Sequence, residues 1–298
     1  MIDTPHRLRA CALWLVISAI SPALGSALDK AIDRRWANDS FWDQGKAEIL
    51  VFESQILREG SLRPAEVIQV IVKEDHLPQM NVKTEDWHKK GLVPRIKFNE
   101  ILTVPTGVYT YRQVVSLFFD RADMRPKKAV VTSQEWCGQT YQELRLEPSR
   151  AVLDFSSYWE GEGKGSRTFA LEDDLIPANA FPVFLRALDL TTAKTYSVST
   201  FPDMISNRVG KPLPVTAAVI VEPPEEITIL GGKKKVVPVR VEWSLNSVSY
   251  KERFWFSKDG LHTLLRRQRA DGGYDELKKR FVLDYWKYNR PGDEKLLQ

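Results

Sequence analysis

VVPVRVEWSLNSVSYKERFWF, residues 236–256, contains two β-like runs on either side of the polar pair Asn246–Ser247. In the first run Val239, Val241 and Trp243 alternate with charged residues. This period of two is typical of an antiparallel strand with one buried face and one solvated face. The stretch therefore predicts a β-hairpin, and we expect antiparallel structure on both sides of it.

The carboxy-terminal part of the chain continues this pattern. Strands are predicted over residues 215–222, 236–245, 248–256, 261–269 and 274–286. Two further joints, 258–260 and 271–273, contain Asp-Gly. This pair favours tight hairpins because it tolerates positive φ at both central positions. The region therefore predicts an antiparallel meander.

The amino-terminal half is also rich in strand-like runs. They cover residues 46–57, 66–73, 95–104, 107–120, 128–133, 140–146 and 150–159. In the third run the apolar alternation shifts phase at Ile101, which predicts a β-bulge there. Residues 30–39 form either a short amphipathic helix or an unstructured lead-in.

A connector divides the two halves. Asn179 is expected to cap a short helix over residues 180–188, with Pro182 in its first turn and the acidic run 172–174 ahead of it. The expected fold class is all-β with one short helix. The expected segments are 1–27, 28–171, 172–210 and 211–298, and the two β halves are compatible with one continuous domain.

The first 27 residues have the layout of a secretory signal peptide. Basic residues Arg7 and Arg9 precede the uncharged, mostly apolar run 10–24, and small residues follow at 25–27. The run is shorter than the ~20 residues that span a bilayer, so we expect cleavage and no transmembrane span afterwards. The predicted location is the periplasm or outer envelope of a bacterium.

Composition excludes several classes of function. The 43 basic and 39 acidic residues give a net charge of +4, with no concentrated basic stripe of the kind that nucleic-acid binding needs. Of the 2 cysteines, Cys11 lies in the expected signal peptide and Cys137 would remain alone, without a disulfide partner. No phosphate loop, metal-spaced His/Cys set or nucleophile elbow is present, so neither a cofactor nor a metal is expected.

TSQEWCGQTY, residues 132–141, is the densest patch of unusual residue types and the first candidate site. On a regular strand Trp136 would face the core, with Glu135 and Cys137 on the other face. Glu135 with Gln139 would then pair with Arg or Lys, either as a structural clasp or as a grip on a ligand. Cys137 is either a small buried hydrophobe or, with a histidine in reach, a nucleophile.

YWEGEGKG, residues 158–165, is the second candidate site. Glu160 and Glu162 would share a face of a strand like an acid/base pair, whereas the three glycines favour a turn with solvated acids. With Asp173 and Asp174 they would form at most a loose calcium site. The candidate ligand-binding residues are Glu135, Trp136, Cys137, Gln139, Tyr141, Tyr158, Trp159, Glu160 and Glu162.

Four motifs carry a resemblance to a known family. Residues 45–49 (GKAEI), 106–111 (TGVYTY), 134–139 (QEWCGQ) and 159–163 (WEGEG) resemble an uncharacterised family of exported bacterial envelope β proteins, a domain of unknown function. Some of its members are labelled as septum formation inhibitors. The resemblance implies a large curved antiparallel sheet or open barrel and an envelope location, and it implies no activity. At fold level the implied sheet is similar to that of periplasmic lipoprotein carriers.

These observations favour a non-enzymatic role. The first expectation is binding of a lipid or other amphiphile in the concave face of the curved sheet, since aromatic residues are plentiful. One alternative is a structural or assembly protein that docks on an envelope partner through a sheet edge or an apolar patch. The other is a hydrolase that uses Cys137 or the paired glutamates.

Overall fold

The computed structural model describes residues 27–171 and 175–297. Residues 1–26 of the expected signal peptide lie outside these ranges, and so does the acidic run 172–174. In the part that is described, no helix is long and apolar enough to cross a bilayer.

The described chain is mostly β structure. Its strands are β1 (Ala47–Arg58), β2 (Ser61–Leu77), β3 (Val82–Lys83), β4 (Val93–Pro105), β5 (Thr110–Asp120), β6 (Pro126–Glu135), β7 (Gly138–Glu147), β8 (Arg150–Ser157), β9 (Lys164–Ala170), β10 (Thr195–Thr200), β11 (Val215–Val221), β12 (Glu225–Ile229), β13 (Gly232–Leu245), β14 (Val248–Ser257), β15 (Leu264–Gln268) and β16 (Tyr274–Leu283). The sequence predicted most of the long strands. It missed β3, β9, β10 and β12, which are short or lack clear alternation.

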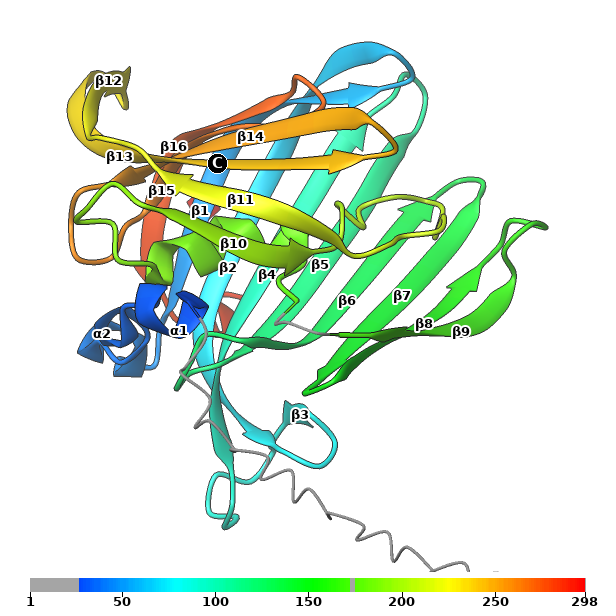
Figure 1. The fold of residues 1–298 in the computed structure, drawn as a ribbon, viewed down its shortest axis with the longest axis horizontal. Coiled ribbons are helices and arrows are strands. Elements are labelled where there is room, and N and C mark those ends of the chain that lie inside the picture. Colours follow the sequence, from blue (N-terminus) through cyan, green and yellow to red (C-terminus); the bar gives the residue numbers. More distant parts are fainter. Residues whose placement is uncertain (1–26, 172–174, 298) are drawn as a thin grey trace, which may run out of the picture.

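All of these strands belong to one antiparallel sheet. Its order is β10-β11-β13-β14-β15-β16-β1-β2-β4-β5-β6-β7-β8-β9, and β12 and β3 pair with β13 and β2 at the side. The two halves of the chain join where β16 pairs with β1. The sheet curves strongly, so that β10–β16 fold over β4–β9 (Figure 1), yet it stays open between β9 and β10. This confirms the predicted fold class.

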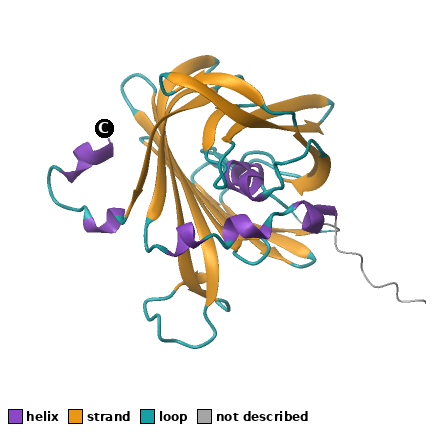
Figure 2. Ribbon diagram, turned by 90° about the vertical axis from the view of Figure 1, so that its left-hand side faces the viewer, coloured by secondary structure: helices purple, strands orange, loops and turns teal. Residues whose placement is uncertain are grey.

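The connector fills the space inside the curve. Its helical turns are η2 (Ala178–Ala180), α3 (Phe181–Phe184) and η3 (Leu185–Ala187), and all of their residues are buried. Figure 2 shows them enclosed by the sheet. Aromatic side chains pack between the connector and the sheet. For example, the ring centroid of Phe181 lies 6.4 Å from that of Phe254 on β14. The concave face is therefore largely covered by the protein's own connector.

Helical turns over residues 178–187 match the predicted short helix at 180–188 in place, but the predicted cap is wrong. Only four residues are α-helical, and the N-cap position of α3 is Ala180, which has no side-chain cap bond. The Asn179 side chain instead donates to Asp203 at 2.6 Å and accepts from the Met204 amide at 2.9 Å. Asn179 thus binds the following loop to the connector rather than starting a helix.

Five more helical segments lie at the two ends of the described chain: α1 (Ala27–Ala31), α2 (Arg34–Ala37) and η1 (Ser40–Asp43) before β1, and η4 (Tyr285–Lys287) and η5 (Asp293–Leu297) after β16. The first three pack against the connector, where the Asp33 amide donates to the Ala187 carbonyl and the Asp189 amide to the Ala31 carbonyl. They show that the 30–39 region is helical rather than an unstructured lead-in.

The predicted bulge at Ile101 is wrong. The β4 register runs unbroken against both β2 and β5. The phase changes in sequence because Glu100, a charged residue, occupies an interior position of the strand. Ile101 faces outward and packs with a second apolar cluster on the outer side of β1 and β2, which Leu297 of η5 also contacts.

The Asn246–Ser247 joint forms the predicted tight hairpin between β13 and β14. Both residues have positive φ, 50° and 64°, as a type I′ turn requires. At residues 258–262, in contrast, the positive φ falls on His262 rather than on the Asp-Gly pair.

Antiparallel pairing gives the sheet two distinct ends. The β1–β2, β4–β5, β6–β7, β8–β9, β13–β14 and β15–β16 turns all lie at one end, toward the upper right of Figure 1. We call these six turns the hairpin rim. The loop 201–214, between β10 and β11, reaches the same end because Thr200 pairs with Val215. The β2–β3–β4 connection and the β14–β15 turn lie at the opposite end.

Candidate functional site

The structure brings both candidate stretches of the sequence to the hairpin rim. Glu135, Trp136 and Cys137 lie at the β6–β7 turn, and residues 158–163 form the β8–β9 turn beside it. These strands are neighbours, since β7 pairs with β8. The two motifs therefore form one region, although no more than their unusual composition linked them in sequence.

A set of hydrogen bonds ties this region to loop 201–214. The Asn207 side chain donates to Glu135 Oε1 at 2.6 Å. Its carbonyl accepts from the Trp159 indole at 2.9 Å and from the Thr140 hydroxyl at 2.6 Å. We call these contacts the loop clasp. The partner of Glu135 is thus an amide rather than the Arg or Lys that we expected.

Glu162 belongs to the same clasp and is not a solvated acid. Its two carboxylate oxygens accept from the backbone amides of Val209 and Gly210, both at 3.0 Å. Burial opposes its ionisation. The hydrogen bonds from Ser157, Val209 and Gly210 outweigh burial and lower the pKa of this carboxyl below its ordinary value. Glu160 two residues earlier is exposed, so the two acids do not act as a pair.

The prediction that Trp136 faces the core is wrong. The chain reverses at Trp136–Cys137, so the regular alternation of the strand ends at Glu135, and the Trp136 side chain is 76% exposed. Cys137 and Gln139 are exposed as well. The nearest ring to Trp136 belongs to Tyr109 of the β4–β5 turn, with 6.3 Å between ring centroids.

The remaining candidate aromatics lie beside these residues. The Tyr158 ring packs over Gly138, at a distance that leaves no space for a Cβ atom there. It also contacts the Trp159 ring, whose other neighbour is the Arg208 guanidinium, 3.6 Å from the ring centroid. Burial and the hydrogen bond that it donates to Glu143 raise the pKa of Tyr141 to about 12.

Large apolar side chains are exposed at both ends of the sheet, and those at the end opposite the rim include Met80, Trp87, Trp286 and Tyr288. Val108, at the β4–β5 turn, is 85% exposed. Large apolar or aromatic side chains are also exposed at the other rim turns and in loop 201–214: Leu57, Leu62, Trp136, Tyr141, Tyr158, Leu213, Val248 and Tyr274. Surface hydrophobic residues scattered singly need no explanation, but the rim set occupies adjacent turns, and such a set can form a contact surface.

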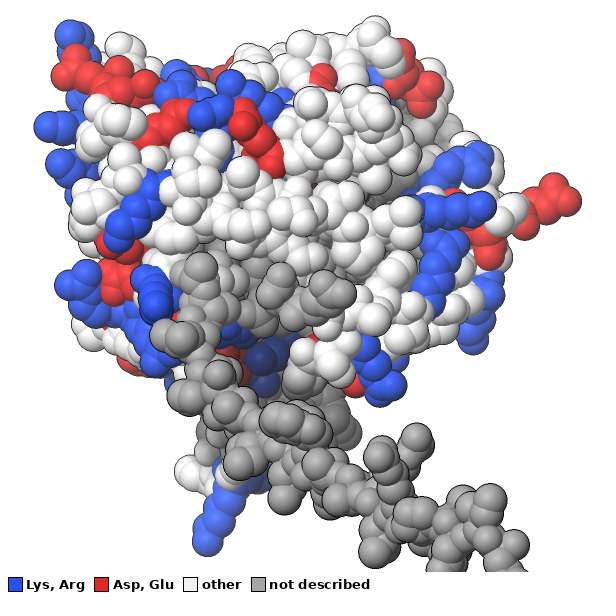
Figure 3. All heavy atoms as spheres, in the orientation of Figure 1, with Lys and Arg blue, Asp and Glu red and all other residues white. Residues whose placement is uncertain are grey.

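Basic side chains accompany these apolar residues. Within the described ranges, seven cations at or near the rim have no carboxylate within ion-pair distance: Arg58, Arg63, Arg112, Lys164, Arg167, Arg208 and Lys211. Figure 3 shows basic side chains gathered along the right-hand edge of the molecule, over β8 and β9. The rim therefore combines apolar tips with these cations, and it also carries the exposed acids Glu59, Glu160 and Asp271.

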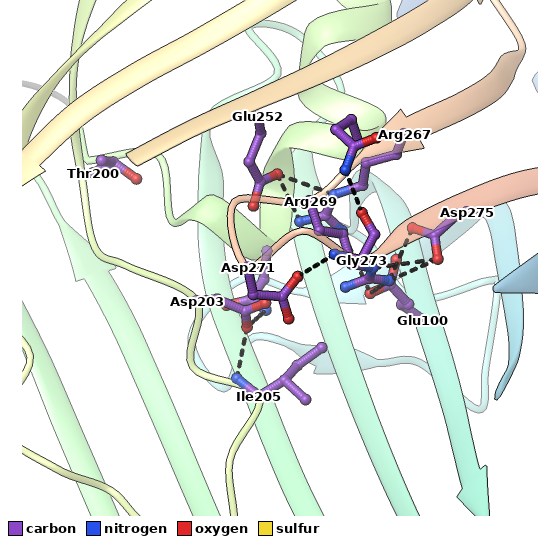
Figure 4. A network of polar contacts seen from close by, with 12 residues as sticks. Glu100, Thr200, Asp203, Ile205, Glu252, Arg267, Arg269, Asp271, Gly273 and Asp275 are labelled. Carbon is purple, nitrogen blue, oxygen red and sulfur yellow. Dashed lines mark hydrogen bonds and ion pairs between the residues drawn. The ribbon is translucent and has the colours of Figure 1, made fainter. Parts of the chain in front are cut away.

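A cluster of buried charges lies in the interior, next to loop 201–214 (Figure 4). Arg267 on β15 donates to Glu252 on β14 at 2.8 Å, and Arg269 approaches Asp275 on β16 at 2.9 Å. Glu100 on β4 accepts from Gln69 at 2.7 Å and lies 3.9 Å from both guanidinium groups.

The cluster holds three carboxyl groups and two guanidinium groups, all of them buried. Burial raises the pKa of Glu100 and the pKa of Glu252 above their ordinary values. The positive charge of Arg267 acts to lower both pKa values, but burial is the larger effect. A proton held by Glu100 would balance the charges. Because solvent does not reach these side chains, we assign the cluster a structural role in joining β4 to β14–β16, not a role in catalysis.

Among the described residues, no histidine lies near Cys137 to act as a general base. The three histidines of the described chain lie at the opposite end: His76 near the end of β2, His88 in the β3–β4 connection and His262 in the β14–β15 turn. The His262 ring contacts the Arg186 carbonyl at 2.8 Å. Among the described residues, no three His, Cys, Asp or Glu side chains are grouped to hold a metal ion. Asp173 and Asp174, named for a calcium site, lie outside these residues.

The sequence alone did not identify Asn207, Val108 or Arg208 as parts of this region. No local pattern marks Asn207, because its role depends on where loop 201–214 returns to the sheet. The exposure of Val108 could have been predicted, since Val108 follows Gly107 in a turn between two strands. An apolar residue at such a tip is expected to be exposed.

Comparison of the chain with protein-family models, with curated proteins and with solved structures found no match.

Proposed function

We propose that this protein is a non-catalytic, exported envelope protein that binds lipid surfaces through its hairpin rim. The observation that carries the proposal is the combination, at the hairpin rim, of exposed apolar tips on adjacent turns with basic side chains that have no carboxylate partner. The proposed ligand is still an amphiphile, as we expect from the sequence. The contact moves from the concave face to the rim because the connector largely covers that face.

The composition of the rim suits a membrane interface. Trp and Tyr favour the headgroup region, where an apolar ring meets lipid and a polar edge meets water. Trp136 and Tyr158 project from neighbouring turns, and Val108 projects from the next turn along. Basic residues near an anionic leaflet add about 1 kcal/mol each. Separate tips can each insert into fluid lipid without the continuous shape match that a protein partner requires.

Docking on an envelope protein is the second candidate, and a different observation supports it. In the described chain, β9 pairs along one side only, with β8, so its other backbone edge is open to a further strand. This mode of binding would use β9 and would not require Trp136 or Val108. The two candidates therefore differ in the residues on which they depend.

Vesicle co-sedimentation tests the lipid proposal. Vesicles of phosphatidylcholine, with and without phosphatidylglycerol, are mixed with wild-type protein and with Trp136→Ala. We expect binding to the anionic vesicles, weakened by salt, and about tenfold weaker in the variant, because one aromatic side chain contributes about 1.5 kcal/mol of burial.

The matched control is Met80→Ala, which removes an exposed apolar side chain at the opposite end of the sheet. It should bind as the wild type does. Equal binding by Trp136→Ala and wild type, or failure of the wild type to bind either vesicle, would refute the proposal. Loss of partner capture on placing a proline in β9 would then favour the second candidate.

A further inference from the structure

A cleft of about 530 Å³ lies at the end of the sheet opposite the rim. The carboxy-terminal part of β2, the residues just before β1, the β3–β4 connection and η4 line it. Its size is within the range of small-molecule sites. Trp87 and Trp286, from segments about 200 residues apart in sequence, are both in its wall.

These two tryptophans are exposed although they line the same cleft. Trp87 is 69% exposed and Trp286 is 47% exposed. An indole in a structural role is ordinarily buried with its N–H paired, as with Trp42, whose N–H donates to the Trp36 carbonyl at 2.8 Å. Trp87 and Trp286 instead offer ring surface to whatever enters the cleft.

The polar part of the wall carries balanced charge. Three acids, Asp43, Glu74 and Asp75, face three lysines, Lys46, Lys73 and Lys83. Several of these groups are already paired. Glu74 lies 3.5 Å from Lys83, Lys73 lies 3.3 Å from Asp75, and Asp43 receives both guanidinium nitrogens of Arg121 at 2.7 Å. A charged ligand would meet like charges as often as opposite ones.

Glu74 holds a lysine of the wall in place: its side chain is only 8% exposed, Oε1 lies 3.1 Å from Lys97 and 3.5 Å from Lys83, and Oε2 lies 3.5 Å from His76. Burial would raise its pKa, but the hydrogen bond with His76 and the charges of Lys97 and Lys83 outweigh burial and hold the pKa at about 2. Its carboxylate therefore stays ionised at neutral pH, close to the lysine donors. Charged donors and acceptors side by side make strong hydrogen bonds with hydroxyl groups, which can both donate and accept.

From these features we infer that the cleft binds a neutral saccharide, with sugar rings stacked on Trp87 and Trp286 and hydroxyls bonded to the Asp75 and lysine side chains. A pyranose ring has an apolar C–H face that suits an indole and a rim of hydroxyls that suits mixed donors and acceptors. An apolar chain would take these charged groups out of water without offering them any hydrogen bond. A strongly charged ligand gains no net attraction here.

This inference is independent of lipid binding at the rim, because the two sites share no residue and lie at opposite ends of the sheet. Saturation-transfer NMR tests it with chitotriose, cellotriose and maltotriose as probes. We expect transfer from at least one trisaccharide. The same titration should show about tenfold weaker binding for Trp87→Ala and for Trp286→Ala, and weaker binding for Asp75→Asn.

The control is Tyr288→Ala, an exposed aromatic near Trp286 in sequence that does not line the cleft. It should bind the same sugar as the wild type does. Absence of transfer from all three sugars would overturn the inference. So would equal affinity in the Trp87→Ala, Trp286→Ala double variant, whose fold is checked by far-ultraviolet circular dichroism. Trp87 projects into solvent, so its loss does not remove core packing.

Discussion

The Arg186 guanidinium donates to the Glu48 carboxylate at 2.7 Å, and neither side chain is exposed to solvent. Arg186 also donates twice to the Leu261 carbonyl, and Arg280 donates to the second oxygen of Glu48. This contact joins the connector to β1, β16 and the β14–β15 turn. It fixes the segment that fills the inside of the sheet.

Removing one partner of this pair should be costly. Arg186→Met leaves Glu48 buried with one cation fewer, so we expect the free energy of unfolding to fall by about 3–5 kcal/mol. Urea denaturation measures it. Arg150→Met, which breaks the exposed Arg150–Glu147 pair, is the control and should change stability by less than about 1 kcal/mol. Equal effects of the two changes would contradict the structural role assigned to Arg186.

Gly138→Ala tests the close packing at the β6–β7 turn. An alanine Cβ would lie 2.5 Å from Tyr158 Cγ, so the ring must move, and we expect a loss of about 1–3 kcal/mol in thermal or urea unfolding. Gly161→Ala is a matched control, because nothing lies within 4 Å of its Cβ position. Tyr158→Leu combined with Gly138→Ala should recover part of the loss. A stable Gly138→Ala protein would show that this packing is looser than described.

Glu100 should make stability depend on pH in an unusual direction. Its pKa is raised in the folded protein above the ordinary 4.5, so its contribution is fully present below about pH 4.5 and is lost as pH rises through the folded value. Glu100→Gln cannot ionise. The stability of this variant relative to wild type should therefore increase with pH, measured by denaturation from about pH 4 to about pH 8. If stability changed with pH in the same way in Glu100→Gln and in the wild type, this prediction would be contradicted.

Glu74 should make stability depend on pH in the direction opposite to that of Glu100. Its folded pKa of about 2 lies below the ordinary 4.5, so its contribution is present above about pH 4.5 and is lost as pH falls toward 2. Two and a half pKa units correspond to about 3 kcal/mol, which partial solvent contact reduces to about 2. Glu74→Gln should lose less stability on acidification. Acid titrations of the two proteins that run in parallel would rule this out.

Much of the fold could be predicted from local pattern. Alternation and turn chemistry place the long strands and the Asn246–Ser247 hairpin, because both depend on neighbouring residues. The pairing of β16 with β1 joins residues more than 200 positions apart, and no local pattern encodes it. Glu100 misled the prediction for a related reason. Its partners Arg267 and Arg269 come from the far end of the chain, so the sequence gives no reason to bury it.

The two candidate stretches lie side by side in the structure, and the prediction for the orientation of Trp136 is wrong. The unusual composition of residues 132–141 and 158–165 located the rim. The assumption of a regular strand put Trp136 inside, whereas the turn ends the alternation at Glu135. Asn207, which completes the loop clasp, depends on the course of a fourteen-residue loop between β10 and β11 and has no local signal.

Strand β2 runs from the hairpin rim to the tryptophan-lined cleft as one strand of 17 residues. At about 3.3 Å per residue it covers about 55 Å of extended backbone. Hydrogen bonds to β1 and β4 along this length make it a stiff spacer. If the rim rests on a bilayer, the cleft is held at a fixed height several nanometres above the headgroups, facing away from the membrane. The sheet would then act as a rigid spacer that sets the distance between a bound sugar and the lipid.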